Sequence, residues 1–222
     1  MVKVYRADTQ KLRNEALFRR LYGTVPIHRR ERIDRLRYQK DQRLSLGAWL
    51  LLVEGMREWG IHDREMELSY GEGGKPFLRD HPDIFFSLSH SGEAVMCAVS
   101  DGEVGCDVEK VKGTDLRIAR RFFHEREYAC ISREETPEAR QRMFYRLWTL
   151  KESFMKVTGL GMRLSLDDFM ISVGGDGIWV EQEVNRGCPY FFKEYFVQED
   201  YQYACCSVRA DFEENMRTVE FS

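Results

Sequence analysis

Hydrophobic and polar positions along the first half of the chain predict helices followed by strands. Residues 2–7 (VKVYRA) alternate between the two kinds and predict a strand. Residues 8–23 and 25–60 instead show helical spacing. After a glycine-rich loop, three apolar runs predict strands at residues 83–92, 93–100 and 103–111. Asp101 and Gly102 predict a hairpin turn between the last two of these strands.

The second half of the chain repeats this order. Helical spacing occurs first, at residues 115–131 and 138–159. Four strand-like segments follow, at residues 167–173, 177–184, 189–198 and 201–208. Runs of helices followed by runs of strands are typical of α+β proteins. We therefore predict an α+β fold of two similar lobes, residues 1–103 and 104–222, each with helices packed on an antiparallel sheet.

The composition is that of a globular protein. Of the 222 residues, 43% are hydrophobic and 32% are charged, which excludes global disorder. A net charge of -3 argues against bulk attraction to a polyanion, and no nucleic-acid recognition module is evident. No apolar run is long enough to span a membrane or to serve as a signal peptide, and the six cysteines form no CxxC pair. We expect a cytoplasmic protein with free thiols that binds neither nucleic acid nor membrane.

The segment VGCDVEK, residues 104–110, places two acids inside an apolar strand. Because side chains alternate along a strand, Asp107 and Glu109 would share one face with Gly105. Two charges at about 6 Å repel by roughly 3 kcal/mol at an effective dielectric constant of about 20. Water would offset that repulsion on an exposed face, and a cation would offset it in a cleft. Mg²⁺ is the natural cation, because it prefers oxygen ligands and often completes its shell with substrate phosphates.

The helical segment 138–159 supplies a third acid and a lysine. Trp148, Glu152 and Lys156 are spaced at i, i+4 and i+8, so they share one helix face. On an open surface the Glu–Lys pair would be worth only about 0.2–0.5 kcal/mol. The large apolar residues beside it favour a lined cleft, in which Glu152 would complete a metal site and Lys156 would meet a phosphate.

Candidate anion-binding groups occur in the first half. Ser89, His90 and Ser91 end an apolar run, and hydroxyls, an imidazole and backbone N–H groups at a strand end suit anions. A turn with local serine caps is the alternative. The GKP sequence at residues 74–76 joins flexible backbone to a cation, without the pattern of a Walker loop. The basic stretch 29–43 is either a solvated helix face or a positive rim for a phosphorylated ligand.

Four of these motifs, taken in order, resemble the 4′-phosphopantetheinyl transferases of the larger, surfactin-synthetase-activating type. The motifs are GKP (74–76), FSLSHS (86–91), VGCDVE (104–109) and WTLKESFMKVTGLG (148–161). The resemblance implies a pseudo-twofold, two-lobed α+β monomer that binds coenzyme A in the cleft between its lobes. It implies transfer of the phosphopantetheine arm to a serine of an apo acyl or peptidyl carrier protein, releasing adenosine 3′,5′-bisphosphate.

The resemblance also implies roles for the acids and the lysine. Asp107, Glu109 and Glu152 would hold Mg²⁺ together with the pyrophosphate, and Lys156 would neutralise charge there as the bridging bond breaks. Glu152, directly or through a metal-bound water, is the expected base for the carrier serine. With His90, Glu152 and Lys156 form the predicted catalytic set. Gly105 would leave room for the metal and the pyrophosphate.

The coenzyme A contacts implied by the resemblance come mainly from the first half. They are Arg43, Gly74, Lys75, Pro76, Ser89, His90 and Lys156. Lys75 and Pro76 would lie at the adenosine, and His90 and Arg43 would chiefly meet the 3′-phosphate. The stretch IHRRER (27–32) departs from the family, which often has lysines here, so arginines of this stretch would have to substitute.

A carrier protein of the expected acidic type would need a basic docking surface. The segment 115–125 offers one, with Arg117, Arg120, Arg121 and Phe122 or Phe123. An ordinary amphipathic helix with a core phenylalanine is the alternative for this segment.

Two other function classes use the same residues. A Mg²⁺-dependent phosphodiesterase or pyrophosphatase would employ the three acids without any carrier. A non-catalytic carrier-protein-binding module would have lost its site, and the intact Asp107, Glu109, Glu152 and Lys156 argue against that.

Overall fold

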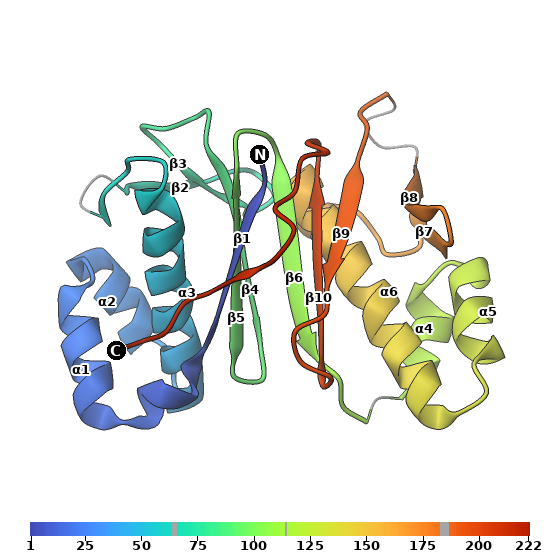
Figure 1. Ribbon diagram of the computed structural model, residues 1–222, viewed down its shortest axis with the longest axis horizontal. Coiled ribbons are helices and arrows are strands. Elements are labelled where there is room, and N and C mark those ends of the chain that lie inside the picture. Colours follow the sequence, from blue (N-terminus) through green and yellow to red (C-terminus); the bar gives the residue numbers. More distant parts are fainter. Residues whose placement is uncertain (64–65, 114, 183–186) are drawn as a thin grey trace.

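The computed structural model describes residues 1–63, 66–113, 115–182 and 187–222. Helices and strands occupy both halves of the chain (Figure 1). The helices are α1 (Glu15–Thr24), α2 (Ile27–Asp34), α3 (Gln39–Arg57), α4 (Arg117–Phe122), α5 (Glu125–Arg133) and α6 (Pro137–Thr158), with 3-10 turns η1 (Thr9–Arg13) and η3 (Gly161–Arg163). The strands are β1 (Lys3–Asp8), β2 (Leu68–Tyr70), β3 (Pro76–Leu78), β4 (Phe85–Ser91), β5 (Ala94–Ser100), β6 (Val104–Lys110), β7 (Phe169–Gly174), β8 (Gly177–Gln182), β9 (Phe191–Tyr195), β10 (Tyr201–Ser207) and β11 (Arg217–Thr218).

Two main sheets form the centre of the molecule. The first has the strand order β11-β1-β5-β4 and the second β6-β10-β9, while β2–β3 and β7–β8 form separate hairpins. The predicted α+β fold of helices on antiparallel sheets is confirmed. The predicted hairpin at Asp101 and Gly102 is wrong, because β5 pairs with β4 and β6 pairs with β10 in the described residues. The turn at Asp101 instead carries the chain from one sheet to the other.

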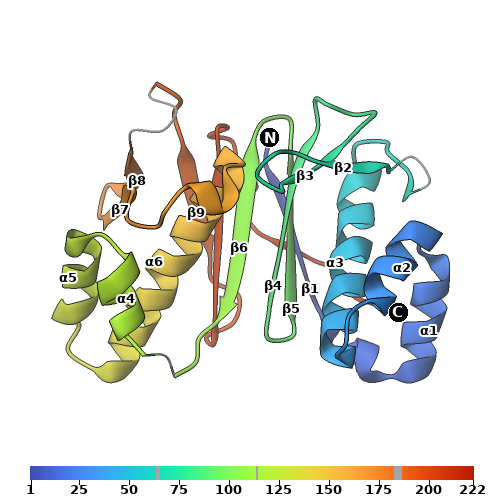
Figure 2. The same cartoon turned by 180° about the vertical axis from the view of Figure 1, so that it is seen from behind.

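The two sheets face each other between two layers of helix (Figure 2). Helix α3 covers the outer face of the first sheet around Trp49, and α6 covers the second around Phe154. A third apolar cluster, which includes Val4, Met96 and Cys106, fills the space between the sheets. Alternation explains the layering: in β5, Val95 and Cys97 belong to the cluster under α3, and Met96 and Ala98 belong to the cluster between the sheets. The result is an α–β–β–α sandwich whose halves meet along β4 and β6.

Two long helices expected from the sequence are interrupted. Residues 25–60 form α2 and α3 with a break at 35–38. Residues 115–131 divide into α4 and α5 because a capping box starts a new helix at His124. The His124 side chain accepts a hydrogen bond from the Arg126 N–H, and the Glu127 carboxylate accepts one from the His124 N–H. Helix α6 begins at a Thr136 N-cap with Pro137 at its first position.

The end of the chain returns to the first half. Strand β11 runs parallel to β1, and Phe221 belongs to the apolar cluster under α3. The boundaries 1–103 and 104–222 stay a prediction, but this last segment packs against the half to which they do not assign it. Among the described residues, no helix is long and apolar enough to cross a membrane. All six cysteines have free thiols, of which Cys130 and Cys188 are exposed and the rest buried.

Candidate active site

Strand β6 and helix α6 place the acids together. On β6, Asp107 faces α6, and a Cβ added at the neighbouring Gly105 would lie 2.1 Å from the Ser153 carbonyl oxygen and 2.5 Å from the Val157 nitrogen. A Cβ essentially never makes non-bonded contacts this short, so only glycine allows the helix to approach this strand. The expected reason for Gly105, room for a metal and a pyrophosphate, is therefore replaced by close packing against α6.

Asp107 is bound on one side only. Its Oδ1 accepts hydrogen bonds from Lys156 Nζ at 2.7 Å and from Ser89 Oγ at 2.7 Å. Its Oδ2 is buried and has no hydrogen-bond donor among the described residues. A buried carboxylate oxygen without a partner is costly, since burial removes its hydration. Asp107 therefore presents an oxygen that a cation would satisfy.

Lys156 connects the two halves of the molecule. Besides Asp107, its ammonium donates to Ser89 Oγ at 3.0 Å and to the Cys106 carbonyl at 3.1 Å. Burial lowers the pKa of Lys156, but the charge and hydrogen bond of Asp107, together with Cys106 and Glu152, outweigh this effect. The net pKa is therefore raised, and the side chain is cationic at neutral pH.

The other two acids have raised pKa values. Burial, followed by the charge of Asp107, raises the pKa of Glu152. Burial also raises the pKa of Glu109, and Asp107 adds to this, although the hydrogen bond from Ser91 opposes it. These carboxylates repel one another in a partly buried place, which is the arrangement that a bound cation relieves.

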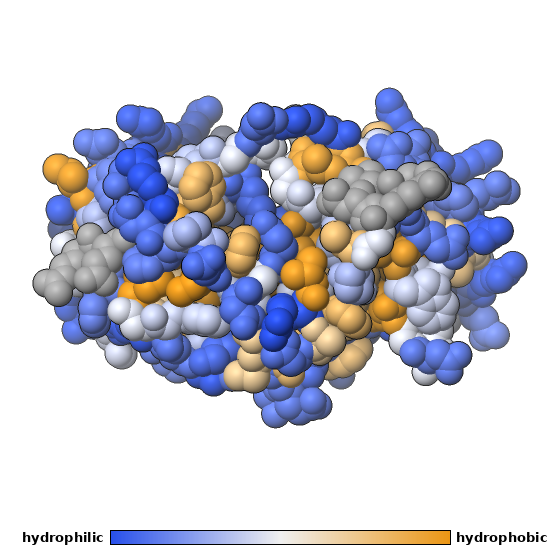
Figure 3. All heavy atoms as spheres, turned by 90° about the horizontal axis from the view of Figure 1, so that it is seen from above, coloured by the Kyte–Doolittle hydropathy of each residue, from blue (hydrophilic) through white to orange (hydrophobic). Residues whose placement is uncertain are grey.

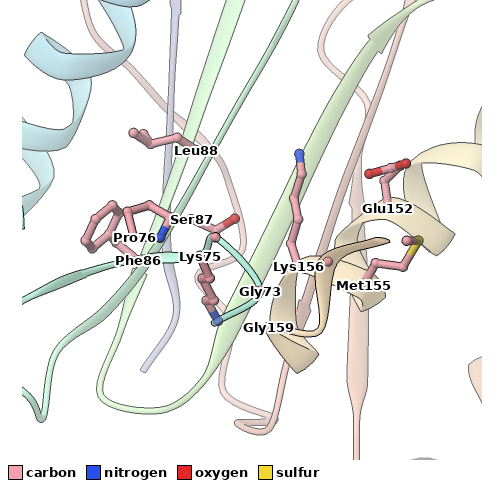
Figure 4. A pocket seen from close by; sticks show the side chains of 12 residues that line it. Gly73, Lys75, Pro76, Phe86, Ser87, Leu88, Glu152, Met155, Lys156 and Gly159 are labelled. Carbon is pink, nitrogen blue, oxygen red and sulfur yellow. The ribbon is translucent and has the colours of Figure 1, made fainter. Parts of the chain in front are cut away.

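The acids line one wall of a cavity of about 340 Å³, here termed the acidic cavity. It is lined by Leu88, Ser89, His90, Asp107, Glu109, Trp148, Glu152 and Lys156. A neighbouring cavity of about 330 Å³, here the glycine-loop cavity, shares Leu88, Glu152 and Lys156 with it. Figure 4 shows Glu152 and Lys156 projecting from α6 to the same side of this second cavity. The two cavities thus adjoin along β4 and α6.

The glycine loop closes against the end of α6. A Cβ at Gly73 would lie 1.9 Å from the Gly159 carbonyl oxygen, and Gly159 ends α6 in the left-handed conformation. Lys75 lines the glycine-loop cavity, and its ammonium donates to the Val157 carbonyl and to Glu103. In Figure 4 this ammonium points away from that of Lys156. Pro76 and Gly74 line the same cavity.

A third, mainly apolar cavity of about 310 Å³ adjoins through Lys75, Pro76, Phe86 and Gly159. Seen from above, apolar surface appears between the two halves, bordered by hydrophilic side chains (Figure 3). The three cavities follow β4 one after another, so together they offer an elongated ligand both a polar end and an apolar end.

The structure brings most of the predicted coenzyme A residues to this groove, with one exception. Ser89 and His90 line the acidic cavity, and partial desolvation, followed by the charge of Lys156, lowers the pKa of His90. Arg43 instead lines a separate cavity of about 340 Å³ with Arg13 and Arg19. Its predicted contact with the 3′-phosphate beside His90 stays a prediction, and among the described residues the side chain of Arg43 lines this other cavity.

The basic stretch is partly used inside the protein. Arg29 is buried, donates to the Ser45 carbonyl at 3.0 Å and lies over the Trp49 ring at 5.4 Å. Burial lowers the pKa of Arg29 to about 10. Arg32 lies over the Tyr70 ring. Because Arg29 is turned inward, it takes part in neither of the two expected arrangements of the basic stretch, the solvated helix face or the positive rim.

The predicted docking helix is only partly exposed. Phe122 on α4 is 41% exposed, with the Arg121 guanidinium over its ring. Phe123 is 5% exposed and stacks on Phe144, so its proposed part in docking is wrong. Sequence spacing in so short a segment did not distinguish the two. Ile118, 38% exposed, was missed as part of this surface.

The site also contains residues that the sequence did not assign to it. Met155 and Leu88 line the glycine-loop cavity, whereas Trp148, expected on the helix face of Glu152 and Lys156, lines the acidic one. Ser91, expected among the anion-binding groups, instead donates to Glu109 Oε2 at 2.6 Å. The sequence signal for this contact was the spacing of two between Ser89 and Ser91, which places both side chains on one face of the strand.

The donor set fits a hard divalent cation in its chemistry. It consists of three carboxylates, one with an unpartnered buried oxygen, and contains no thiolate. In the described residues no group of three His, Cys, Asp or Glu side chains is close enough together to hold a metal ion. The carboxylates thus do not form a ready-made cage, and Lys156 supplies the positive charge at Asp107.

Comparisons with known proteins show the family to which the chain belongs. Residues 103–206 match the 4′-phosphopantetheinyl transferase superfamily, and residues 13–102 match the 4′-phosphopantetheinyl transferase N-terminal family. The chain therefore belongs to the 4′-phosphopantetheinyl transferase family and is an enzyme of that class.

Individual relatives extend over nearly the whole chain. The chain is 34% identical over 203 residues to the 4′-phosphopantetheinyl transferase Sfp of Bacillus subtilis (strain 168), an alignment that covers 91% of this chain and 90% of that protein. It is 34% identical to another 4′-phosphopantetheinyl transferase of Bacillus subtilis, covering 87% and 86%. Among solved structures, Thermotoga maritima holo-[acyl-carrier-protein] synthase (AcpS) aligns with a TM-score of 0.41 and 20% identity, covering 48% of this chain and 61% of that one.

Proposed function

We propose that this enzyme transfers the 4′-phosphopantetheine arm of coenzyme A, with Mg²⁺, to a serine of an apo acyl or peptidyl carrier protein and releases adenosine 3′,5′-bisphosphate. The observation that carries the proposal is the acidic cavity. There, three carboxylates of the second half face Ser89 and His90 of the first half, beside Lys156. An elongated groove that joins this cavity to an apolar one suits a long ligand with a pyrophosphate in its middle.

The chemistry is a substitution at phosphorus. The serine oxygen of the carrier forms a bond to the phosphorus that carries pantetheine, and the bond from that phosphorus to the bridging oxygen breaks. The leaving adenosine bisphosphate takes the electron pair, and Lys156 neutralises the charge that develops. A contact of Lys156 with that phosphate would replace one of its three present hydrogen bonds.

Glu152 is the proposed acceptor of the serine proton. It faces both cavities, and no hydrogen-bond donor to its carboxylate is found in the described residues. Burial raises its pKa toward the range in which a carboxylate is an effective base near neutral pH. His90, whose lowered pKa keeps it neutral, would bind a phosphate oxygen through one ring N–H.

Asp107, Glu109 and Glu152 would hold the Mg²⁺ ion, with the buried Asp107 Oδ2 as the first oxygen to gain a partner. When bound, the ion supplies charge that polarises the pyrophosphate and stabilises the leaving group. Without it, the mutual repulsion of the three carboxylates is offset in part by Lys156, which forms its ion pair with Asp107.

The carrier would dock on α4, where Arg117, Arg120 and Arg121 flank the exposed Ile118 and Phe122. An apolar pair surrounded by arginines complements an acidic helical partner. We further propose a cytoplasmic monomer, with the free thiols as support for a reducing compartment.

Mass spectrometry of the carrier tests the proposal. The enzyme is incubated with coenzyme A, Mg²⁺ and each of several apo acyl and peptidyl carrier proteins. We expect the carrier to gain the mass of the phosphopantetheine arm at its serine, and a carrier with that serine replaced by alanine to remain unmodified. Hydrolysis of coenzyme A with an unmodified carrier would indicate a phosphodiesterase instead.

A further inference from the structure

Strand β4 carries three serines that all reach across to the second half of the molecule. Ser87, Ser89 and Ser91 are spaced two apart, so they share one face of the strand. Figure 2 shows β4 and β6 side by side where the halves meet. No backbone ladder joins them in the described residues, since β4 pairs with β5 and β6 pairs with β10. Serine hydroxyls take its place.

The three hydroxyls hold different groups. Ser87 Oγ accepts from the Cys106 N–H at 3.0 Å, a contact with backbone alone. Ser89 Oγ donates to Asp107 Oδ1, and Ser91 Oγ donates to Glu109 Oε2 at 2.6 Å. Two serines of the first half therefore each bind one carboxylate of the second half.

The direction of the Ser91 contact is fixed by chemistry. Ser91 Oγ also lies 3.2 Å from the Lys110 nitrogen, and a backbone N–H can only donate. The serine oxygen must accept there, which leaves its single hydrogen for Glu109. Among the described residues, Ser91 is the one hydrogen-bond donor to that carboxylate. The hydroxyl is thus anchored on one side and directs its hydrogen to Glu109 on the other.

Glu109 needs such a restraint. Its carboxylate is half-buried and lies on the same strand face as that of Asp107, so like-charge repulsion favours rotamers that turn it out of the acidic cavity. A hydroxyl anchored on the backbone opposes that rotation, because any outward rotamer loses a charge-assisted hydrogen bond.

We propose that Ser91 is a positioning residue that holds the Glu109 carboxylate in the acidic cavity for a divalent cation. The inference rests on the proposed function, in which Glu109 is a metal ligand. Partners that orient metal ligands typically change metal affinity by about 10- to 100-fold when removed. Because Ser91 belongs to the first half and Glu109 to the second, the affinity for the cation depends on how β4 and β6 meet.

The test compares Ser91→Ala with a matched control, Ser87→Ala, which removes a hydroxyl of the same strand that binds no carboxylate. Mn²⁺ binding to the isolated protein is followed by electron paramagnetic resonance, and the Mg²⁺ dependence of carrier modification is measured separately. We expect Ser91→Ala to weaken Mn²⁺ binding by about tenfold and to raise the Mg²⁺ concentration needed for half-maximal turnover, with kcat recovered at saturating Mg²⁺. Ser91→Thr, which keeps the hydroxyl, should restore binding.

Equal Mn²⁺ affinities for the wild type and Ser91→Ala would overturn the role of Ser91 and leave the proposed function intact. An equal loss of Mn²⁺ affinity in Ser87→Ala would also overturn it, since the loss would then come from the general contact between β4 and β6. If the wild type modifies carriers but binds no divalent cation, both the metal site and this role are wrong. If the wild type binds Mn²⁺ with the predicted difference but modifies no carrier, Ser91 positions a metal ligand and the proposed reaction fails.

Discussion

Two lysines of helix α6, five positions apart, each form an ion pair with a carboxylate, and the two pairs differ in how completely they are satisfied. The Lys151 ammonium is fully buried and donates to both oxygens of Glu127, at 2.6 and 2.7 Å, and to the Phe169 carbonyl at 2.8 Å. Glu127 also accepts from the backbone N–H groups of Ile171 and His124. Every donor and charge in this pair has a partner, so it joins α6 to α5 and β7.

The pair formed by Lys156 and Asp107 is incomplete. Lys156 is 30% exposed, Asp107 Oδ2 has no partner in the described residues, and two further acids share the cavity. Burial lowers the pKa of Lys151 against the opposing effect of Glu127, whereas the pKa of Lys156 is raised. A satisfied buried pair serves the structure, and an unsatisfied one leaves interactions for a ligand.

Replacing Lys151 should have the largest effect on stability. Lys151→Met leaves the buried Glu127 charge without its cation, and breaking such a pair typically costs about 3–5 kcal/mol. Urea unfolding followed by circular dichroism measures the loss, and Lys156→Met, at a partly exposed pair, is the control with a much smaller loss. Similar losses in both variants would contradict the distinction between the pairs.

Replacing Lys156 should act on turnover. Lys156→Met removes the charge that stabilises the leaving group, and losses of this kind are about 10²- to 10³-fold in kcat. Steady-state assays of carrier modification measure it, and Glu152→Gln should likewise abolish transfer while the circular dichroism spectrum stays unchanged. Near-normal turnover in either variant would remove that residue from the proposed mechanism.

The stability of the folded protein should depend on pH and Mg²⁺ through the carboxylates of the acidic cavity. Folding raises the pKa of Glu152 above its ordinary value of 4.5, so between these two values the folded state binds more protons than the unfolded state. The free energy of unfolding therefore falls as the pH rises from the ordinary value through the raised one. Glu152→Gln should therefore melt higher than the wild type at pH 7.5 but not at pH 4.

Mg²⁺ should reverse that order. At about 100 times its dissociation constant a ligand stabilises the folded state by about 2.7 kcal/mol, and only the wild type retains all three carboxylates. Differential scanning fluorimetry with and without Mg²⁺ measures both effects. An unchanged difference between the two proteins across pH would contradict the raised pKa of Glu152.

Arginines on the surface provide the last comparison with the two lysine pairs, and replacing them should have the smallest effect. Changing Arg120 and Arg121 on α4 to Glu should raise KM for the carrier by about 5- to 10-fold, since exposed charges each contribute about 1 kcal/mol or less. The KM for coenzyme A should not change. Arg19 and Arg20 on α1, changed in the same way, provide the control. An unchanged KM for every carrier would place the docking surface elsewhere.

The sequence predicted those parts of the site that depend on local periodicity. Alternation along β6 placed Asp107 and Glu109 on one face of that strand. Helical spacing placed Glu152 and Lys156 on one face of α6. The pairing of β6 with β10 was missed, because residues 111–200 separate the two strands and an adjacent turn after β5 was sufficient to explain the pattern. Lys151 with Glu127, and Ser91 with Glu109, join residues 24 and 18 positions apart, beyond any local pattern.

The return of residues 217–221 to the first half has a consequence for folding. The first sheet gains its edge strand β11, and its core gains Phe221, from residues that are synthesised after the whole of the second half. During translation the first half therefore waits for its own last strand while α6 and its sheet are being made. Contacts over such a long sequence separation slow folding. They also make the core of the first half depend on residues that follow the second half. We expect both halves to unfold together.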